Sequence, residues 1–128
     1  ILIKDNHLAL VPLKEAVRKA RAYSRYVNVE VEVETAEDAL LAAREGADII
    51  LLDNMLPREV QGTLDLLTEN SLREEVVIEV SGNITPETLE SYAVLGIDTI
   101  SMGSLTHTIK NIDISLDIKG AMSTVRIF

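Results

Sequence analysis

Two carboxylates and a lysine are the first residues in this chain whose types could do chemistry. Glu32 belongs to the stretch VEVEVE, in which valine and glutamate alternate from Val29 to Glu34. Asp53 ends the apolar run DIILLD, and Lys4 follows the short apolar run ILI. Carboxylate oxygens suit Mg²⁺ and sugar hydroxyls, and a lysine ammonium suits anionic substrates. Taken alone, each of these residues could equally be a solvated surface charge.

The alternation in VEVEVE raises the question of what faces its glutamates. Side chains of a strand alternate between faces, so the valines share one face and the glutamates the other. Carboxylates about 7 Å apart repel by about 2.4 kcal/mol at an effective dielectric near 20, and hardly at all in open water. The face is therefore either a solvated edge-strand face, which is the simpler interpretation for Glu30, or it meets a positive group. Lys4 is the candidate for that group.

Two glycine-containing loops form a candidate phosphate site. Ser81, Gly82 and Asn83 follow the run VVIEV, and Gly103 and Ser104 follow DTISM. Glycine lets backbone N–H groups approach an anion, and helix N-termini favour negative charge. Either loop alone could be a tight strand-to-helix turn, but the two together favour phosphate, which α/β barrels often bind after their last two strands.

The elements that must position these residues alternate between strand and helix. Strand-like runs cover 1–3, 29–33, 48–53, 76–80 and 98–102, and helical patterns cover 12–26, 35–46, 57–67 and 85–96. Thr35 and Thr85 are the expected N-caps of two of these helices, and Gly96 is expected just past the end of the last. The pattern predicts an α/β fold with parallel strands. Five strands are too few to close a barrel of eight, so we expect most of an incomplete, open TIM-like barrel.

The candidate residues all stand where a predicted strand ends. In parallel α/β folds, the carboxyl ends of the strands meet at one edge, and ligands bind there. We therefore expect Lys4, Glu32, Asp53, Ser81 and Gly103 to converge at one end of the sheet. The histidines His7 and His107 are, each taken alone, more often helix caps or packed side chains than ligands.

Composition narrows the classes of function. The chain has 128 residues, of which 47% are hydrophobic, with a formal net charge of −9. This acidity argues against nucleic acid or an anionic membrane surface as partner. The chain lacks cysteine, which excludes a disulfide, a thiolate metal site and a thiol nucleophile and fits a cytoplasmic location. Because the sequence opens on ILIKDNH without methionine, we interpret it as a fragment of a longer protein or a trimmed terminus.

Five motifs in this order resemble quinolinate phosphoribosyltransferase, the carboxylating nicotinate-nucleotide pyrophosphorylase: IKDNH, VEVE, ADIILLDNM, SGNIT and ISMGSLTH…DISLDI. The resemblance implies that residues 1–118 are the C-terminal part of the barrel domain, that 119–128 are a tail, and that the N-terminal sandwich domain is absent. It implies a glycosyltransferase of NAD biosynthesis. Quinolinate and phosphoribosyl pyrophosphate, with Mg²⁺, would give nicotinate mononucleotide, pyrophosphate and CO₂, in the cytoplasm and in a homodimer or higher homo-oligomer.

The resemblance also implies roles by position. Lys4 would meet the anionic substrates, while Glu32 and Asp53 would hold the ribose hydroxyls and Mg²⁺. The residues that would surround the 5′-phosphate follow the last two strands: Ser81, Gly82, Asn83, Gly103, Ser104 and His107. The family usually reads SGGI where this chain reads SGNI, and since asparagine tolerates a positive φ, the turn should survive.

The family's arginines and His-Arg pair that grip quinolinate belong to parts outside this sequence. The chain would therefore hold the phosphoribosyl half of the site and is expected to be inactive alone.

Two alternatives remain open from the sequence. DIILLDNMLP also resembles the strand and loop around the phosphoacceptor of a response-regulator receiver domain, which would make Asp53 a phosphorylation site. Receivers need an acidic pair after the first strand and a lysine after the fifth, whereas this chain has Lys4-Asp5 and Gly103-Ser104 there. The other alternative is an inactive barrel fragment that retains only the fold.

Overall fold

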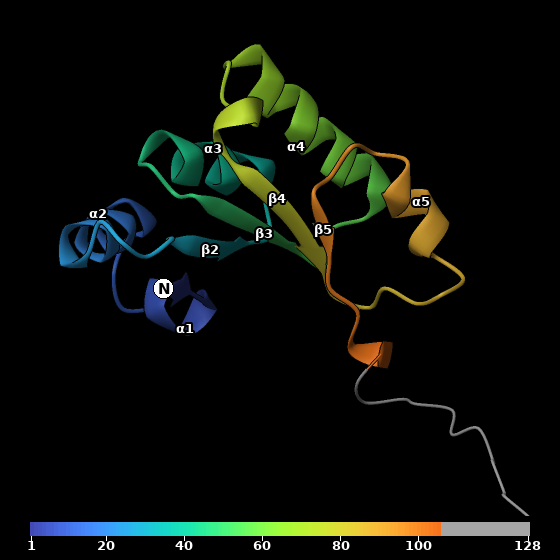
Figure 1. The fold of residues 1–128 in the computed structure, drawn as a ribbon, viewed down its shortest axis with the longest axis horizontal. Coiled ribbons are helices and arrows are strands. Elements are labelled where there is room, and N and C mark those ends of the chain that lie inside the picture. Colours follow the sequence, from blue (N-terminus) through green and yellow to red (C-terminus); the bar gives the residue numbers. More distant parts are fainter. Residues whose placement is uncertain (106–128) are drawn as a thin grey trace, which may run out of the picture.

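The sheet follows the order of the sequence. The computed structural model describes residues 1–105. Its five strands lie in the order β1-β2-β3-β4-β5, and each neighbouring pair is parallel. The strands are β1 (Leu2–Ile3), β2 (Glu30–Val33), β3 (Ile49–Asp53), β4 (Val77–Ser81) and β5 (Thr99–Ile100). The sheet is open, as expected for an incomplete barrel (Figure 1).

Helices connect the strands and arch over one face of the sheet (Figure 1). They are α1 (Asp5–Leu8), α2 (Leu13–Tyr23), α3 (Ala36–Arg44), α4 (Pro57–Glu69) and α5 (Leu89–Ala93), with short 3₁₀ turns η1 (Arg73–Glu75) and η2 (Gly103–Leu105). Because every crossover places the next strand on the same side of the last, the sheet curves around one axis like a barrel wall. A doubly wound sheet would instead reverse direction and carry helices on both faces.

The core lies between the sheet and the helix layer. Val29, Val31 and Val33 are at most 4% exposed, so the valine face of β2 points toward the helices as the alternation predicted. The neighbouring strands and the helices add aliphatic side chains to the same core: Ile50, Leu52, Ile78, Val80, Val17, Val60 and Leu67. Burial of these side chains is the main stabilising term, at about 1.5–3 kcal/mol for each large aliphatic residue.

The glutamate face of β2 is the opposite one, away from the helix layer. β2 pairs with β1 on one side and β3 on the other, so it is an interior strand. The solvated edge-strand interpretation of its glutamates is therefore wrong. The register places Glu32 beside Leu51 of β3, and Leu51 beside Glu79 of β4.

The helix after β4 begins later than the sequence suggested. The expected N-cap is Thr85, but the N-cap is Thr88 and α5 begins at Leu89. The backbone N–H of Thr85 donates to the Thr88 hydroxyl at 3.0 Å, so residues 85–88 form a turn of their own before the helix. Gly96 lies past the helix end with a φ of 73°, as predicted.

Some predictions fall outside the described residues. They are the role of His107, the extended DISLDI segment and the boundary between residues 1–118 and the tail 119–128.

Candidate active site

Lys4 and Glu32 form an ion pair at the carboxyl ends of β1 and β2. Lys4 Nζ lies 3.2 Å from Glu32 Oε2, and the Glu32 side chain is only 16% exposed. The backbone N–H of Lys4 donates to Nδ1 of His7 at 3.0 Å, so His7 caps the short helix α1 and fixes the lysine backbone. The hydrogen bond and charge of Glu32 raise the pKa of Lys4, with smaller contributions from Asp5 and Asp53. The ammonium therefore stays charged throughout the neutral range.

Asp53 ends β3 next to Ser81, the last residue of β4, and the two are paired in register. Asp53 Oδ2 accepts a hydrogen bond from Asn54 Nδ2 at 2.6 Å. Because the Asp53 charge contributes to the raised pKa of Lys4, the two side chains share one electrostatic environment. Lys4, Glu32 and Asp53 thus lie at the same edge of the sheet, as the sequence predicted.

The loop after β4 turns sharply at two residues with positive φ. Gly82 has a φ of 88° and Asn83 a φ of 52°. A Cβ on Gly82 would lie 2.7 Å from the backbone nitrogen of Asn54 and would collide with the Asn54 side chain. Glycine is therefore required here by both backbone conformation and close approach. Asn83 keeps the turn where the resembling family has a second glycine, as expected.

The loop after β5 stands at the same edge. The Ser101 backbone N–H donates to the Val80 carbonyl at 2.9 Å, which extends the pairing with β4 toward η2. Gly103 and Ser104 begin η2. Among the described residues, the buried Oγ of Ser104 has no hydrogen-bond partner, so this hydroxyl can donate to an incoming oxygen. The helix start expected behind the Ser81–Asn83 loop is displaced to Thr88, so the loop does not run directly into a helix N-terminus.

Glu79 of β4 is a third acidic side chain near the site, and it was not identified from the sequence. Glu79 Oε1 accepts a hydrogen bond from the Ser101 hydroxyl at 2.5 Å. Burial raises the pKa of Glu30, and the nearby charge of Glu79 raises it further. A glutamate inside the apolar run VVIEV, two residues before Ser81, was the available sequence signal, because residues two apart on a strand share a face.

Glu32 and Asp53 are the side chains that could hold a hard divalent cation. Glu32 and Asp53 each offer carboxylate oxygens at the strand ends, and Mg²⁺ in phosphate chemistry is commonly held by one or two carboxylates plus substrate oxygens. Within residues 1–105, no group of three or more His, Cys, Asp or Glu side chains is placed to hold a metal by itself. A cavity of about 320 Å³ opens beside Glu32, lined also by Asp5 of α1 and Glu34, Thr35 and Asp38 at the start of α3.

Comparison with known proteins assigns the chain to a family. The family model "Quinolinate phosphoribosyl transferase, C-terminal domain" matches residues 1–117. The chain belongs to this family. It is 46% identical over 121 residues to the probable carboxylating nicotinate-nucleotide pyrophosphorylase of Methanothermobacter thermautotrophicus, covering 93% of this chain and 43% of that protein. It is 38% identical over 120 residues to the human nicotinate-nucleotide pyrophosphorylase, covering 92% and 40%.

Solved structures give the same result for this quinolinate phosphoribosyl transferase domain. NadC from Streptococcus pyogenes superposes with a TM-score of 0.78 at 43% identity, over 88% of this chain and 39% of that one. The nicotinate-nucleotide pyrophosphorylase of Francisella tularensis gives a TM-score of 0.77 at 36% identity, over 89% and 38%. The chain spans about two fifths of the length of the relatives it matches.

The receiver-domain alternative is wrong on two grounds. The family match covers residues 1–117 of the 128, which include every residue that the structure describes. The strand order is also sequential, whereas the flavodoxin-like order of receivers is 2-1-3-4-5. Among the helices described here, none is long and apolar enough to span a membrane.

Proposed function

We propose that the protein carrying this domain is a carboxylating nicotinate-nucleotide pyrophosphorylase. It would convert quinolinate and phosphoribosyl pyrophosphate into nicotinate mononucleotide, pyrophosphate and CO₂. The observation that carries the proposal is the Lys4–Glu32 ion pair beside Asp53 and the Ser81–Asn83 loop, at the carboxyl edge of a sheet of this family. Lys4 supplies a cation for the anionic substrates, Glu32 and Asp53 supply carboxylates for the ribose hydroxyls, and the loop supplies a turn for phosphate.

The geometry suggests how the residues would act. Transfer of the ribosyl carbon from pyrophosphate to the quinolinate nitrogen develops positive charge on that carbon. A fixed carboxylate at Glu32 would stabilise this charge more in the transition state than in the ground state, which accelerates the step. Lys4 holds Glu32 in place and keeps its own positive charge for the anionic substrates.

The phosphate end of the substrate would lie against the loops after β4 and β5. The backbone turn at Gly82 and Asn83 supplies hydrogen-bond donors there, as does the Ser104 hydroxyl, which has no partner within residues 1–105. Asp53, between this loop and Glu32, would hold ribose hydroxyls. Mg²⁺, held by Glu32 and Asp53 together with substrate oxygens, would neutralise charge on the pyrophosphate leaving group.

The chain carries the phosphoribosyl half of the site, so the test uses the intact enzyme. We expect Mg²⁺-dependent formation of nicotinate mononucleotide from quinolinate and phosphoribosyl pyrophosphate, with CO₂ released in equal amount. The isolated 128-residue chain should give no turnover. Absence of product from the intact protein with both substrates at saturation would refute the proposal.

We further propose a cytoplasmic homodimer or higher homo-oligomer. The support is the family resemblance, in which the N-terminal domain of one subunit covers the barrel of its partner. Light scattering on the intact enzyme would give the mass of the assembly, and a strictly monomeric active enzyme would refute this part.

A further inference from the structure

Three residues with positive φ meet where β3 and β4 end. Asn54 has a φ of 54°, Gly82 of 88° and Asn83 of 52°. A left-handed backbone is unfavourable for residues other than glycine and persists only where the surrounding structure enforces it. Two asparagines in this conformation, facing each other across neighbouring loops, therefore call for a physical explanation.

The side chain of Asn54 connects the two loops. Its Nδ2 donates to Asp53 Oδ2 at 2.6 Å, and its Oδ1 accepts from Asn83 Nδ2 at 2.9 Å. Its backbone N–H donates to the Ser81 carbonyl at 3.0 Å. The missing Cβ of Gly82 leaves the space that the Asn54 amide occupies. The Asn54 amide therefore contacts both the Asp53 carboxylate at the end of β3 and the turn after β4.

The loop that carries Asn54 is also anchored from outside the sheet. The buried Tyr92 of α5 donates its hydroxyl proton to the Met55 carbonyl at 3.1 Å. Met55 is itself 7% exposed. The residue after Asn54 is thus held against a helix, which restricts the positions that the Asn54 amide can take.

We infer that Asn54 is a positioning residue that holds the Asp53 carboxylate and the Ser81–Asn83 loop in one fixed geometry. The inference rests on the proposed function, because it assigns those two groups to one bound phosphoribosyl pyrophosphate. The Asn54 amide donates to Oδ2 of Asp53 and so orients this carboxylate, which leaves Oδ1 for a ligand. Asn83, where the resembling family has glycine, acts on Asn54 through its side chain and contributes to phosphate binding through its backbone.

The test uses calorimetric binding of phosphoribosyl pyrophosphate with Mg²⁺ to the intact enzyme, alongside steady-state kinetics. Asn54→Gly keeps the positive φ and removes both side-chain hydrogen bonds. Since loss of a group that orients a ligating carboxylate typically costs 10–100-fold in affinity or activity, we expect binding about tenfold or more weaker. The KM for quinolinate should not change, because the amide touches only the phosphoribosyl half.

Two further variants separate positioning from general stability. Asn83→Gly removes one hydrogen bond and should weaken binding a few-fold, and adding it to Asn54→Gly should have no further effect, because both remove the same contact. The matched control is Asn70→Gly, at the other end of the molecule. Asn70 also makes two side-chain hydrogen bonds, with Arg44 and with the Leu66 carbonyl. We expect Asn70→Gly to lower the unfolding midpoint and leave binding unchanged.

The outcomes distinguish the inference from the function on which it rests. If Asn54→Gly folds poorly, Asn54→Asp serves in its place. Aspartate has the same size and tolerates the same backbone conformation, but it replaces the donor to Asp53 with a repelling charge. Wild-type binding that both variants retain would overturn the inference alone. A loss of binding shared equally by Asn70→Gly would also overturn it, since the effect would then be one of stability. A wild-type enzyme that binds no phosphoribosyl pyrophosphate would overturn the proposed function as well.

Discussion

The two edges of the sheet use their acidic residues differently. At the amino edge, Asp48 precedes β3 and accepts two hydrogen bonds from Arg21 Nη1, at 3.0 and 2.9 Å. Its Oδ2 also accepts from the backbone N–H of Val29 at 2.7 Å. This carboxylate ties a helix, a strand start and the preceding strand together.

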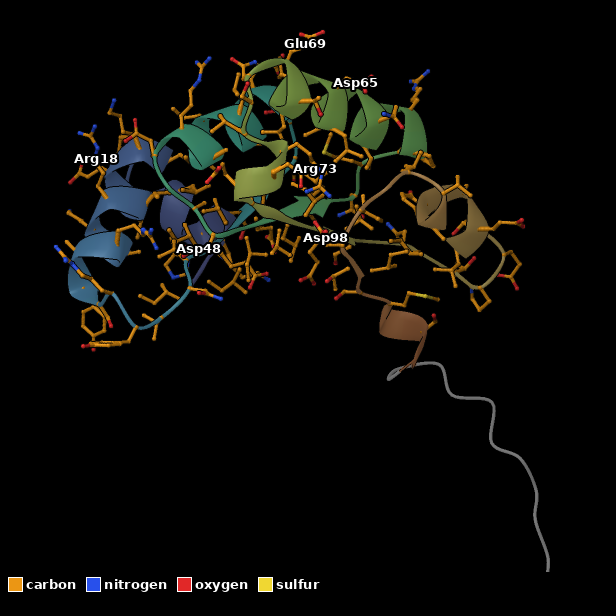
Figure 2. All side chains as sticks on the ribbon, turned by 45° about the horizontal axis from the view of Figure 1, so that its top comes forward. Arg18, Asp48, Asp65, Glu69, Arg73 and Asp98 are labelled. Carbon is orange, nitrogen blue, oxygen red and sulfur yellow. The ribbon has the colours of Figure 1, made fainter. Side chains whose placement is uncertain are left out.

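The same arrangement recurs two strands further on. Asp98 precedes β5 and accepts from Arg73 Nη2 at 3.0 Å and from the backbone N–H of Ile78 at 2.7 Å. Arg73, from η1, lies side by side with Asp98, and Asp48 occupies the corresponding place at the start of β3 (Figure 2). Each amino-edge aspartate therefore satisfies a backbone donor that would otherwise lack an acceptor.

At the carboxyl edge, the acidic residues bond to flexible or neighbouring side chains instead. Glu32 pairs with a lysine that is 48% exposed, and Asp53 with the amide of the next residue. These carboxylates tie no strand starts together, and their remaining lone pairs can serve a ligand. In α/β barrels, conserved architecture at the amino face serves stability and the carboxyl face serves chemistry. In this sheet, likewise, the aspartates at the amino edge hold the fold together, whereas Glu32 and Asp53 at the carboxyl edge have oxygens left for a ligand.

The largest expected effect is the loss of activity from Glu32→Gln. In the intact enzyme we expect a fall of at least two powers of ten, about 3 kcal/mol of transition-state stabilisation, because the carboxylate no longer balances the charge on the ribosyl carbon. The fold should be retained, since glutamine has the same volume. Glu30→Gln is the matched control, because Glu30 shares the face but lies deeper, away from the strand end. Steady-state formation of nicotinate mononucleotide measures both, and a crippled Glu30→Gln with an active Glu32→Gln would contradict the assignment.

The next effect concerns glycine at the carboxyl edge. Gly82→Ala should destabilise the intact enzyme by about 1 kcal/mol or more, since alanine is strained at a φ of 88° and its Cβ collides with Asn54. It should also weaken binding of phosphoribosyl pyrophosphate.

Gly62→Ala is the control, because it makes the same substitution at a glycine whose backbone and surroundings tolerate a side chain. Gly62 lies inside α4 and a Cβ there would meet nothing within 4 Å. Alanine should stabilise the helix by about 0.5–1 kcal/mol. Urea denaturation of both variants measures the difference, and a Gly82→Ala variant as stable as wild type would count against the close packing of the two loops.

At the amino edge, the expected effect is on stability instead of activity. Asp98→Ala removes the acceptor of the Ile78 N–H and the ion pair with Arg73, which should cost about 1–3 kcal/mol of unfolding free energy. The kcat of the folded enzyme should stay within a factor of about two, because Asp98 lies at the edge of the sheet opposite the candidate site.

Asp65→Ala controls for the removal of an aspartate. Asp65 is exposed on α4, where it accepts from Gln61, and should change stability by less than about 0.5 kcal/mol (Figure 2). Chemical denaturation and kcat are measured for both Asp98→Ala and Asp65→Ala. A large loss of kcat in Asp98→Ala at full folding would remove the distinction between the two edges.

The smallest expected effect is a dependence of folding stability on pH, caused by Glu30. Burial, followed by the charge of Glu79, raises the pKa of Glu30 in the folded state, so folding favours its protonated form. Its contribution to stability is fully present below its unfolded pKa and is lost as pH rises through the raised folded pKa. Glu30→Gln has no charge to bury and should be more stable than wild type at neutral pH, with a difference that vanishes in acid. Thermal unfolding across pH measures this, and Glu69→Gln, on the outer side of α4, controls for the change in net charge.

Local patterns accounted for most elements of the fold. The single-turn helix α1 was not predicted. The hydrophobic runs and the glycine and proline punctuation predicted the five strands and the helices α2 to α5, because burial and turn formation leave their marks within a few residues. Thr35 illustrates this: its hydroxyl accepts from the Asp38 N–H at 3.1 Å, as an N-cap should. Thr85 illustrates the limit. Two threonines three residues apart could each cap the helix, and the turn that Thr88 closes with Thr85 decided between them.

The candidate site was predictable in its location but not in its connections. The sequence indicated that polar residues after successive strands would share an edge. It did not indicate that the Asn54 amide would join Asp53 to Asn83, since the partners come from different loops and the contact depends on the space left by Gly82. Glu79 was missed for a similar reason, because its partner Ser101 lies just after the next strand, β5.

Which face of β2 is buried follows from the residue pattern alone. Strict alternation leaves one face entirely valine, and that face is removed from water when the strand pairs and packs. The pattern does not show that the glutamate face lies on an interior strand or that Glu32 meets Lys4 at 3.2 Å; both come from the folded chain. Alternation is a property of neighbouring residues, whereas the register between parallel strands depends on how the intervening helices pack. A shift of one residue in that register would turn the same carboxylate away from the lysine.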